Sequence, residues 1–318
     1  MTELNENKVS ISVIIPTFNR EQELLQLLKE VDSQGAVKLL FEIRDDASAC
    51  SYNTLRTTHF ENIKVVLQRN KKNVGFAENV CRLLENCESD YCVLMADDDH
   101  LLGHGVAKLN GYLRNNIVDF ASTQSFVSGL LYRGSRRNKS IQTNDFMLAA
   151  SRAPGLVFRV KAVSKYLSVI RERLRVDCQF ASMYPQVCLL MLMLRDNLIC
   201  VYLAFPIESL GFNRSSGLKV HGSPFWSIEA RAKQLANACD FVASSFPLES
   251  QGEFKKALAY NFIPRLFGVL NKKKRVQLIL LLLKRTVWRL AVEASPSSIK
   301  DFVKVNITEF RVKGRWKK

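Results

Sequence analysis

The sequence lacks any apolar run of the ~18–20 residues that a membrane-spanning helix needs. Its longest apolar runs, Val187–Leu194 and Leu278–Leu283, are much shorter. The first ten residues are polar and include acids, which is not the pattern of a secretory signal. We therefore expect a cytoplasmic chain that is soluble or peripheral to a membrane.

Cysteine pairs at the spacing of metal or redox sites are also missing. The chain has eight cysteines and four histidines, but no Cys-x-x-Cys and no histidine at zinc-finger spacing from a cysteine. Because no export is expected, we expect reduced thiols and no disulfides. The cysteines that lie in apolar runs are interpreted as core residues: Cys81, Cys87, Cys92, Cys188 and Cys200.

Acidic residues are too few to balance the basic ones. There are 46 Lys and Arg against 30 Asp and Glu, a net charge of +16, and residues 226–318 hold 19 of the bases but only 7 of the acids. Such an excess favours anionic partners: nucleic acid, a membrane surface or phosphorylated substrates. The sequence has no ribonucleoprotein motif, helix-turn-helix cue or zinc finger, so nucleic-acid binding is the least favoured of these.

Short β-branched runs alternate with helical apolar stripes over the first hundred residues. Helical stripes run through Leu24–Val31 and Phe76–Leu84. The predicted strands are Ile11–Ile15, Leu39–Ile43, Ile63–Leu67 and Tyr91–Met95. Such alternation predicts a parallel sheet covered by helices, which is an α/β fold.

Polar side chains follow the predicted strands at the points where they end. In parallel sheets, ligands bind beyond the carboxyl ends of the strands. The residues placed there are Thr17, Asn19, Asp45, Asp46 and the run Asp97–Asp99. Adjacent carboxylates repel, and Mg²⁺ or Mn²⁺ with phosphate oxygens as further ligands would relieve that repulsion. The alternative is a solvated acidic turn.

Several of these segments resemble the motifs of the family 2 glycosyltransferases. The resemblance rests on ISVIIPTFNR at Ile11–Arg20, RDDAS at Arg44–Ser48, NVGFAEN at Asn73–Asn79, and the acid run. It implies a GT-A fold, a Rossmann-like and mostly parallel sheet flanked by helices. It also implies a nucleotide-sugar donor.

The resemblance implies a role for each matched position. The loop after the first strand would contact the nucleoside through Pro16, Thr17, Phe18 and Asn19. Asp45 or Asp46 would reach the base or ribose, and Arg69, Asn73 and Gly75 would lie beside the ribose and diphosphate. Ala96 stands where many members have their first acid. Asp97 and Asp98 would therefore serve the nucleotide, and Asp98 or Asp99 would bind Mg²⁺ or Mn²⁺.

The second half departs from the family pattern. Many members carry a catalytic Glu-Asp pair at the start of a helix, where this chain has Tyr184-Pro185-Gln186. A glutamine is not a base. The Tyr184-Pro185 dipeptide here is similar to that of the subgroup that includes the abequosyltransferases of bacterial O-antigen assembly. Asp177 is the candidate base, with an exposed surface acid as the alternative, and Tyr184 would touch the acceptor.

Two loops and a basic tail complete the predictions. Ser128–Thr143 reads as a mobile loop. Leu210–Ser223 reads as a second one, whose Arg214, Lys219 and His221 would close over the diphosphate or form a plain basic surface. Residues 226–318 are expected to be helical, and Lys272–Arg275 before Val276–Leu283 favours an anionic membrane surface over packing on the core.

The sequence as a whole predicts a metal-dependent, inverting glycosyltransferase. Its catalytic domain would span residues 1–225, with a donor half at 1–103 and an acceptor half at 104–225, followed by the basic region. The acceptor would be a saccharide, lipid-linked, in bacterial surface polysaccharide or O-antigen synthesis. The main alternative is a catalytically weak or dead relative that still binds a nucleotide sugar.

Overall fold

The computed structural model describes residues 9–35, 38–127, 130–133, 135, 137–209, 219–220, 223–224 and 228–268. The contacts within the chain divide it into two compact units. Unit 1 is Met1–Ser215, and unit 2 is Ser216–Lys318.

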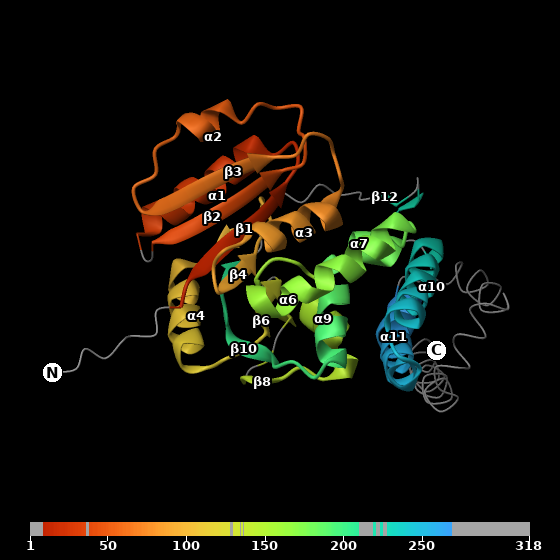
Figure 1. Ribbon diagram of the computed structural model, residues 1–318. Coiled ribbons are helices and arrows are strands. Elements are labelled where there is room, and N and C mark those ends of the chain that lie inside the picture. The colour runs from red at the N-terminus through yellow and green to blue at the C-terminus, as the bar shows by residue number, and fades with distance from the viewer. Residues whose placement is uncertain are drawn as a thin grey trace, which may run out of the picture. The chain divides into compact units, whose positions relative to one another are not determined.

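Unit 1 is built on a nine-stranded sheet in the order β3-β2-β1-β4-β9-β6-β10-β8, with β7 paired to β6 (Figure 1). The strands are β1 (Ile11–Thr17), β2 (Leu39–Asp45), β3 (Ile63–Arg69), β4 (Tyr91–Leu94), β6 (Phe120–Val127), β7 (Leu130–Arg133), β8 (Lys139–Ser140), β9 (Leu156–Arg159) and β10 (Cys200–Pro206). The β3-β2-β1-β4 half is parallel, which confirms the predicted sheet, whereas β9 is antiparallel to both of its neighbours.

Parallel pairing extends the first three strands beyond their apolar runs. Thr17 at the end of β1 pairs with Asp45 at the end of β2, and Asp45 pairs in turn with Arg69 of β3. Pro16 lies inside β1 and does not end it, since a proline keeps its carbonyl acceptor. The sheet therefore carries its polar strand ends in register along one edge.

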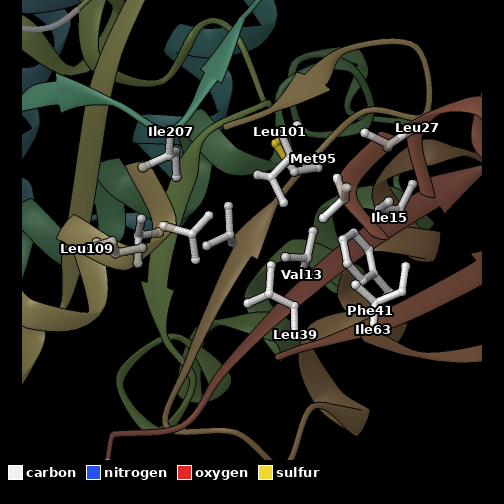
Figure 2. Close-up of a cluster of buried hydrophobic side chains, with 14 of the residues drawn as sticks. Val13, Ile15, Leu27, Leu39, Phe41, Ile63, Met95, Leu101, Leu109 and Ile207 are labelled. Atoms are coloured by element: carbon white, nitrogen blue, oxygen red, sulfur yellow. The ribbon is translucent and has the colours of Figure 1, made fainter. Parts of the chain in front are cut away.

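One face of the sheet is covered by α1 (Glu21–Gln34), α2 (Asn53–Thr57) and α4 (Gly103–Asn115). Figure 2 shows the cluster that joins them, with Val13 and Ile15 of β1 packed near Leu27 of α1 and Phe41 of β2. These side chains are at most 3% exposed. Each buried aliphatic side chain of this kind contributes roughly 1.5–3 kcal/mol.

Other helices join the donor half of unit 1 to its acceptor half. α3 (Phe76–Asn86) contacts β1 and β2, and also α7 (Leu167–Arg175) and α8 (Gln179–Met183). Arg171 of α7 bonds Glu85 of α3 at 2.7 and 2.8 Å and Glu78 at 3.1 Å. α7 is preceded by α6 (Val160–Val163) and a 3-10 turn at Ser164–Tyr166.

The helix predicted from Pro185 forms as α9 (Pro185–Arg195). Every residue from Pro185 to Met193 is buried, as expected for a helix that is apolar all round. α9 packs against α5 (Phe146–Ala150), which follows a 3-10 turn at Thr143–Asp145. All eight cysteines are free thiols, and those interpreted as core residues are buried.

The prediction of one loop over Ser128–Thr143 was wrong in part. That segment contains β7, which forms a hairpin with β6, and β8, which pairs with β10. Its many Gly, Ser and Arg residues favour a loop, but Arg133 at the end of β7 is 1% exposed and bonds the Thr123 carbonyl at 3.0 Å. A buried hydrogen bond to the backbone of β6 therefore overrides the local composition.

The described part of unit 2 starts with a short antiparallel pair, β12 (Lys219–Val220) and β13 (Ser223–Pro224). It continues in α10 (Ile228–Ser245) and α11 (Leu248–Gly268), which confirms helix as far as Gly268. Phe246, in the turn between them, lies 6.1 Å from Phe241 of α10 and 4.7 Å from Phe254 of α11, ring centre to ring centre. No helix in the described parts of the chain is long and apolar enough to cross a membrane. Lys272–Arg275 and Val276–Leu283 lie outside the described residues.

Two glycines of α4 test how closely it packs on β10. A Cβ at Gly105 would lie 2.3 Å from the Pro206 carbonyl oxygen, which is backbone, whereas a Cβ at Gly111 would meet nothing within 4 Å. We expect Gly105→Ala to lower the free energy of unfolding by roughly 1–3 kcal/mol. Gly111→Ala should raise it by up to ~1 kcal/mol through helix propensity. Urea unfolding of both variants checks this, and changes of the same sign would contradict the packing.

Candidate functional site

The structure brings the acid run to the end of β1. Thr17 Oγ1 donates a hydrogen bond to Asp97 Oδ2 at 2.7 Å, and lies 3.2 Å from the Tyr52 hydroxyl. All three side chains are buried. The carboxyl edge of the parallel strands is where ligands bind in α/β sheets. The predicted neighbourhood of Thr17 and Asp97 is therefore present.

Arg20 forms ion pairs with the first two acids of the run. Its Nη1 lies 2.5 Å from Asp98 Oδ2 and 3.4 Å from Asp97 Oδ1. Burial raises the pKa of Asp97 to about 6, although the Thr17 hydrogen bond and Arg20 act in the opposite direction. Asp97 is thus a buried acid held by one hydroxyl and one guanidinium, while Asp98 is the more exposed neighbour.

The third acid belongs to a separate, more deeply buried ionic cluster. Arg152 Nη2 donates to Asp99 Oδ2 at 2.6 Å and to Glu208 Oε2 at 3.2 Å. Arg133 Nη2 lies 3.5 Å from Glu208 Oε1, and neither of these two side chains is exposed. Burial raises the pKa of Glu208, and both arginines oppose that rise. Removing one partner from such a buried set typically costs about 3–5 kcal/mol.

A second small sheet delivers Glu208 to this place. β11 (Glu208–Ser209) pairs antiparallel with β5 (His100–Leu101), which directly follows the acid run. Gly155 leaves room for the cluster, because a Cβ there would lie 2.7 Å from Glu208 Cγ and 2.8 Å from Arg133 Nη2. Gly155 also has φ +77, which disfavours other residues.

Asp45, the last residue of β2, is completely buried and turned toward the protein. Its Oδ1 accepts hydrogen bonds from the Ser48 backbone N–H, at 3.0 Å, and from the Ser48 hydroxyl. Arg69 Nε lies 3.2 Å from its Oδ2, and Arg69 also donates to the carbonyl oxygens of Ser48 and Cys50. Asp45 and Arg69 therefore fix the loop that follows β2.

Asp46 holds the segment that leads into α3. Its Oδ1 accepts from the Val74 N–H at 2.8 Å and from Asn70 Nδ2 at 2.9 Å, and its Oδ2 accepts from the Gly75 N–H at 2.8 Å. Asn73 Oδ1 accepts from the same Gly75 N–H at 3.0 Å. In this structure both second-strand acids bind the protein, so a contact of either with a base or ribose stays a prediction.

Asn19 joins the loop after β1 to the loop after β2. It has φ 57, a left-handed conformation that asparagine tolerates. Its N–H donates to Ser48 Oγ at 2.7 Å, and its Oδ1 accepts from the Ala49 N–H at 2.8 Å. Asn19 therefore shapes the site and does not cap α1, while Phe18 beside it is 45% exposed.

Comparison with known proteins identifies this arrangement. The model of the family described as Glycosyl transferase family 2 matches residues 12–171, half of the chain. That range includes the strand-end motifs and the whole acid run. The chain belongs to glycosyl transferase family 2.

One curated relative and two solved structures place this family 2 chain further. A 109-residue stretch is 31% identical to abequosyltransferase RfbV of Salmonella typhimurium, and it spans only 32% of this chain and 32% of that relative. TarS 1-349 of S. aureus in complex with UDP-GlcNAc has a TM-score of 0.59 at 13% identity, covering 90% of this chain and 79% of that one. Its complex with UDP gives 0.56 at 12% identity, with coverage of 92% and 82%. These likenesses confirm the predicted GT-A fold.

The predicted acceptor residues lie in the helices after β9. Asp177 is exposed in the turn after α7, with φ 53, and within the described residues its carboxylate has no hydrogen bond or ion pair. Tyr184 is 7% exposed, and its ring centre lies 5.7 Å from that of Phe180. Gln186 is 2% exposed, and its buried Oε1 has no hydrogen-bond partner among the described residues. Arg214 and His221 lie outside the described residues, and Lys219 is the first residue of β12.

Three charged residues of the site were not predicted from the sequence: Arg20, Arg152 and Glu208. Arg20 stands inside a quoted motif, but Arg152 and Glu208 lie 53 and 109 residues after Asp99, with no periodicity that links them. One signal was available for Glu208. It directly follows the apolar run Val201–Ile207, so the strand-end rule that selected Asp97 also selects Glu208.

Asp46 offers a test of whether a second-strand acid is structural. Asp46→Asn places an amide where the carboxylate now accepts backbone N–H groups. We expect the free energy of unfolding, without ligand, to fall by about 1–3 kcal/mol. Glu88→Gln, an exposed acid in the turn before β4, is the control and should change it by less than ~0.5 kcal/mol. Urea unfolding measures both changes. Equal changes in the two variants would show that the fold does not depend on the Asp46 carboxylate, which would then be available to a ligand.

Proposed function

We propose that this family 2 chain transfers a sugar from a nucleotide-sugar donor to a saccharide acceptor, with inversion at the anomeric carbon and with Mg²⁺ or Mn²⁺. The observation that carries the proposal is the contact of Thr17 with Asp97, which joins the β1 loop to the acid run. Around it, the loops after β1 and β2 are fixed to one another through Asn19 and Ser48. A nucleoside on these loops would place its diphosphate at the acid run.

The acids fit a metal ion that arrives with a diphosphate. The described residues contain no group of three or more His, Cys, Asp or Glu side chains that could hold a metal by themselves. Mg²⁺ is commonly bound by one or two carboxylates together with substrate phosphates. Asp98 and Asp99 supply that number of carboxylates. A cation held there would stabilise the negative charge that develops on the departing diphosphate.

The chain's own cations would assist the same leaving group. Arg20 lies against Asp97 and Asp98, and Arg152 lies against Asp99, so two guanidinium groups already lie beside the acid run. Fixed charges of this kind stabilise charge that develops in the transition state. Inverting transfer also needs a base for the acceptor hydroxyl. We propose Asp177 for this role, with Tyr184 as an acceptor contact.

A specific observation favours a second candidate function. The helix position where many family members carry Glu-Asp holds Pro185 and Gln186 at the start of α9. A chain without a base could bind the donor and transfer the sugar slowly or not at all. Hydrolysis of nucleotide sugars by the purified protein separates the two candidates, because a dead relative would bind the nucleotide without hydrolysis.

The acceptor is proposed to be a lipid-linked saccharide of bacterial surface polysaccharide synthesis, including O-antigen. The abequosyltransferase relative supports this proposal, and its aligned stretch covers 32% of each chain. A lipid-linked acceptor would be met at the cytoplasmic face of the membrane, where residues 226–318 would bind anionic lipid. Nucleic acid is not a proposed partner.

The donor proposal predicts metal-dependent stabilisation by a nucleoside diphosphate. With Mn²⁺ or Mg²⁺ present, one of UDP, GDP, CDP or TDP should raise Tm, and binding at a hundred-fold excess over Kd adds about 2.7 kcal/mol. Asp99→Ala should abolish the metal-dependent part of this rise in Tm. Thermal unfolding with metal or with EDTA measures both effects.

The matched control is Asp90→Asn, at the opposite end of β4. Asp90 accepts hydrogen bonds from Ser10, at 2.7 and 2.9 Å, so the change lowers Tm without touching the acid run. Its ligand-induced rise should equal that of the wild type. If no nucleoside diphosphate raises the Tm of the wild type, the donor proposal is wrong. If the rise in Asp99→Ala still depends on metal, Asp99 is not a ligand of that metal.

The membrane proposal is tested through the basic run at Lys272–Arg275. Changing these four residues to Gln should weaken binding to phosphatidylserine vesicles, since each basic residue near such a surface contributes about 1 kcal/mol. High salt should weaken wild-type binding as well. The control changes four exposed basic residues of unit 1 to Gln: Lys38, Arg56, Lys64 and Arg114. Equal vesicle sedimentation of the two variants would contradict the proposal.

A further inference from the structure

Arg152 carries buried N–H groups that no atom of the described residues accepts. Its side chain is 9% exposed, and its Nη2 binds Asp99 and Glu208. Its Nε and Nη1 are buried, and neither has a hydrogen-bond partner in the part of the chain that the structure describes. Buried polar groups are nearly always paired, so each exception calls for an explanation. The guanidinium is planar, so these open N–H groups lie in one plane with the nitrogen that touches Asp99.

The surroundings hold Arg152 by its backbone and by one shared nitrogen. Arg133 Nη1 donates to the Arg152 carbonyl oxygen at 2.8 Å, which fixes the chain between α5 and β9. Thr123 Oγ1 donates to the Gly155 carbonyl oxygen at 2.9 Å in the same segment. Glu208 then fixes the guanidinium itself. The open N–H groups are therefore built into a rigid frame beside Asp99.

We propose that Arg152 binds the diphosphate of the nucleotide donor, and that Glu208 is the residue that positions it. This inference rests on the proposed function and assigns to that site a residue outside the sequence motifs. A phosphate accepts two parallel hydrogen bonds from a guanidinium, given by Nη2 together with either Nε or Nη1. Once Nη2 turns from Asp99 to the phosphate, one of the open nitrogens completes such a pair. The neighbour that Arg152 already touches, Asp99, is a proposed ligand of the metal that accompanies the same diphosphate.

Charge balance explains why an anion would be accepted here. Among the described residues, Asp99 and Glu208 offset the charges of Arg133 and Arg152. Once Asp99 serves a metal ion, the guanidinium beside it loses a partner, and an anionic ligand restores the balance. Glu208 shares the same nitrogen, so Arg152 can leave Asp99 and still keep one carboxylate.

The experiment measures affinity for a nucleoside diphosphate against affinity for its nucleoside, by calorimetry with Mn²⁺ present. UDP, GDP, CDP and TDP are tried in turn, and the tightest is the probe. Arg152→Lys and Arg152→Gln should weaken diphosphate binding roughly ten-fold or more, the factor expected for lost hydrogen bonds to a charged group. Affinity for the nucleoside should stay unchanged.

The role of Glu208 is read from a double-mutant cycle. Glu208→Gln should weaken diphosphate binding when Arg152 is present and have no further effect in the Arg152→Gln background. Arg152→Gln alone leaves buried carboxylates without a compensating cation. The double variant removes one charge of each sign, so we expect it to fold even where the single variant does not. Arg159→Gln, at the opposite end of β9 and 3.5 Å from Asp119, is the control and should bind as the wild type does.

Two results overturn the inference. A folded Arg152 variant with wild-type diphosphate affinity shows that Arg152 only supports the fold, and so does an equal loss for nucleoside and diphosphate. A wild type that binds none of the four diphosphates instead refutes the donor proposal itself, and this inference with it. The failures are distinguishable because the first two require a wild type that binds.

Discussion

Compensation of buried carboxylates is the constraint on which the rest of the site depends. Three consecutive acids lie at the end of a buried strand, and Asp97 and Asp99 are at most 8% exposed. Charges in such places must be paired, because their desolvation is expensive. The chain pairs these acids with cations from distant segments, Arg20 after β1 and Arg152 before β9. The same ion pairs therefore stabilise the buried acids and hold the loops around them.

The same ion pairs also favour the binding of a ligand. Each arginine is shared between carboxylates, Arg20 between Asp97 and Asp98, and Arg152 between Asp99 and Glu208. A cation bound to two carboxylates can give up one of them at a lower cost than a cation with a single partner. Binding of a metal and a diphosphate can then proceed by exchange of partners, without exposing an unpaired charge in a buried place.

Much of the donor half could be predicted because its signals are local. The strand Ile11–Ile15, the polar residues after it and the acid run are each visible within a few residues, and parallel pairing then gathers them. The hairpin at Leu130–Arg133 could not be predicted, since Arg133 reads as a loop residue until Glu208, 75 residues later, gives it a buried partner. Asparagine just before a helix commonly caps it, but the amide oxygen of Asn19 accepts from the Ala49 N–H of a separate loop.

The sequence by itself determined the alternation of strands and helices, the family and the acids at the strand ends, because periodicity and short motifs are properties of neighbouring residues. Only the tertiary structure decided which charges meet. Arg152 and Glu208 reach Asp99 through the pairing of β11 with β5 and through a glycine at position 155 that leaves space for them. Ion pairs carry no sequence spacing of their own, since any two segments that the fold brings together can supply the partners.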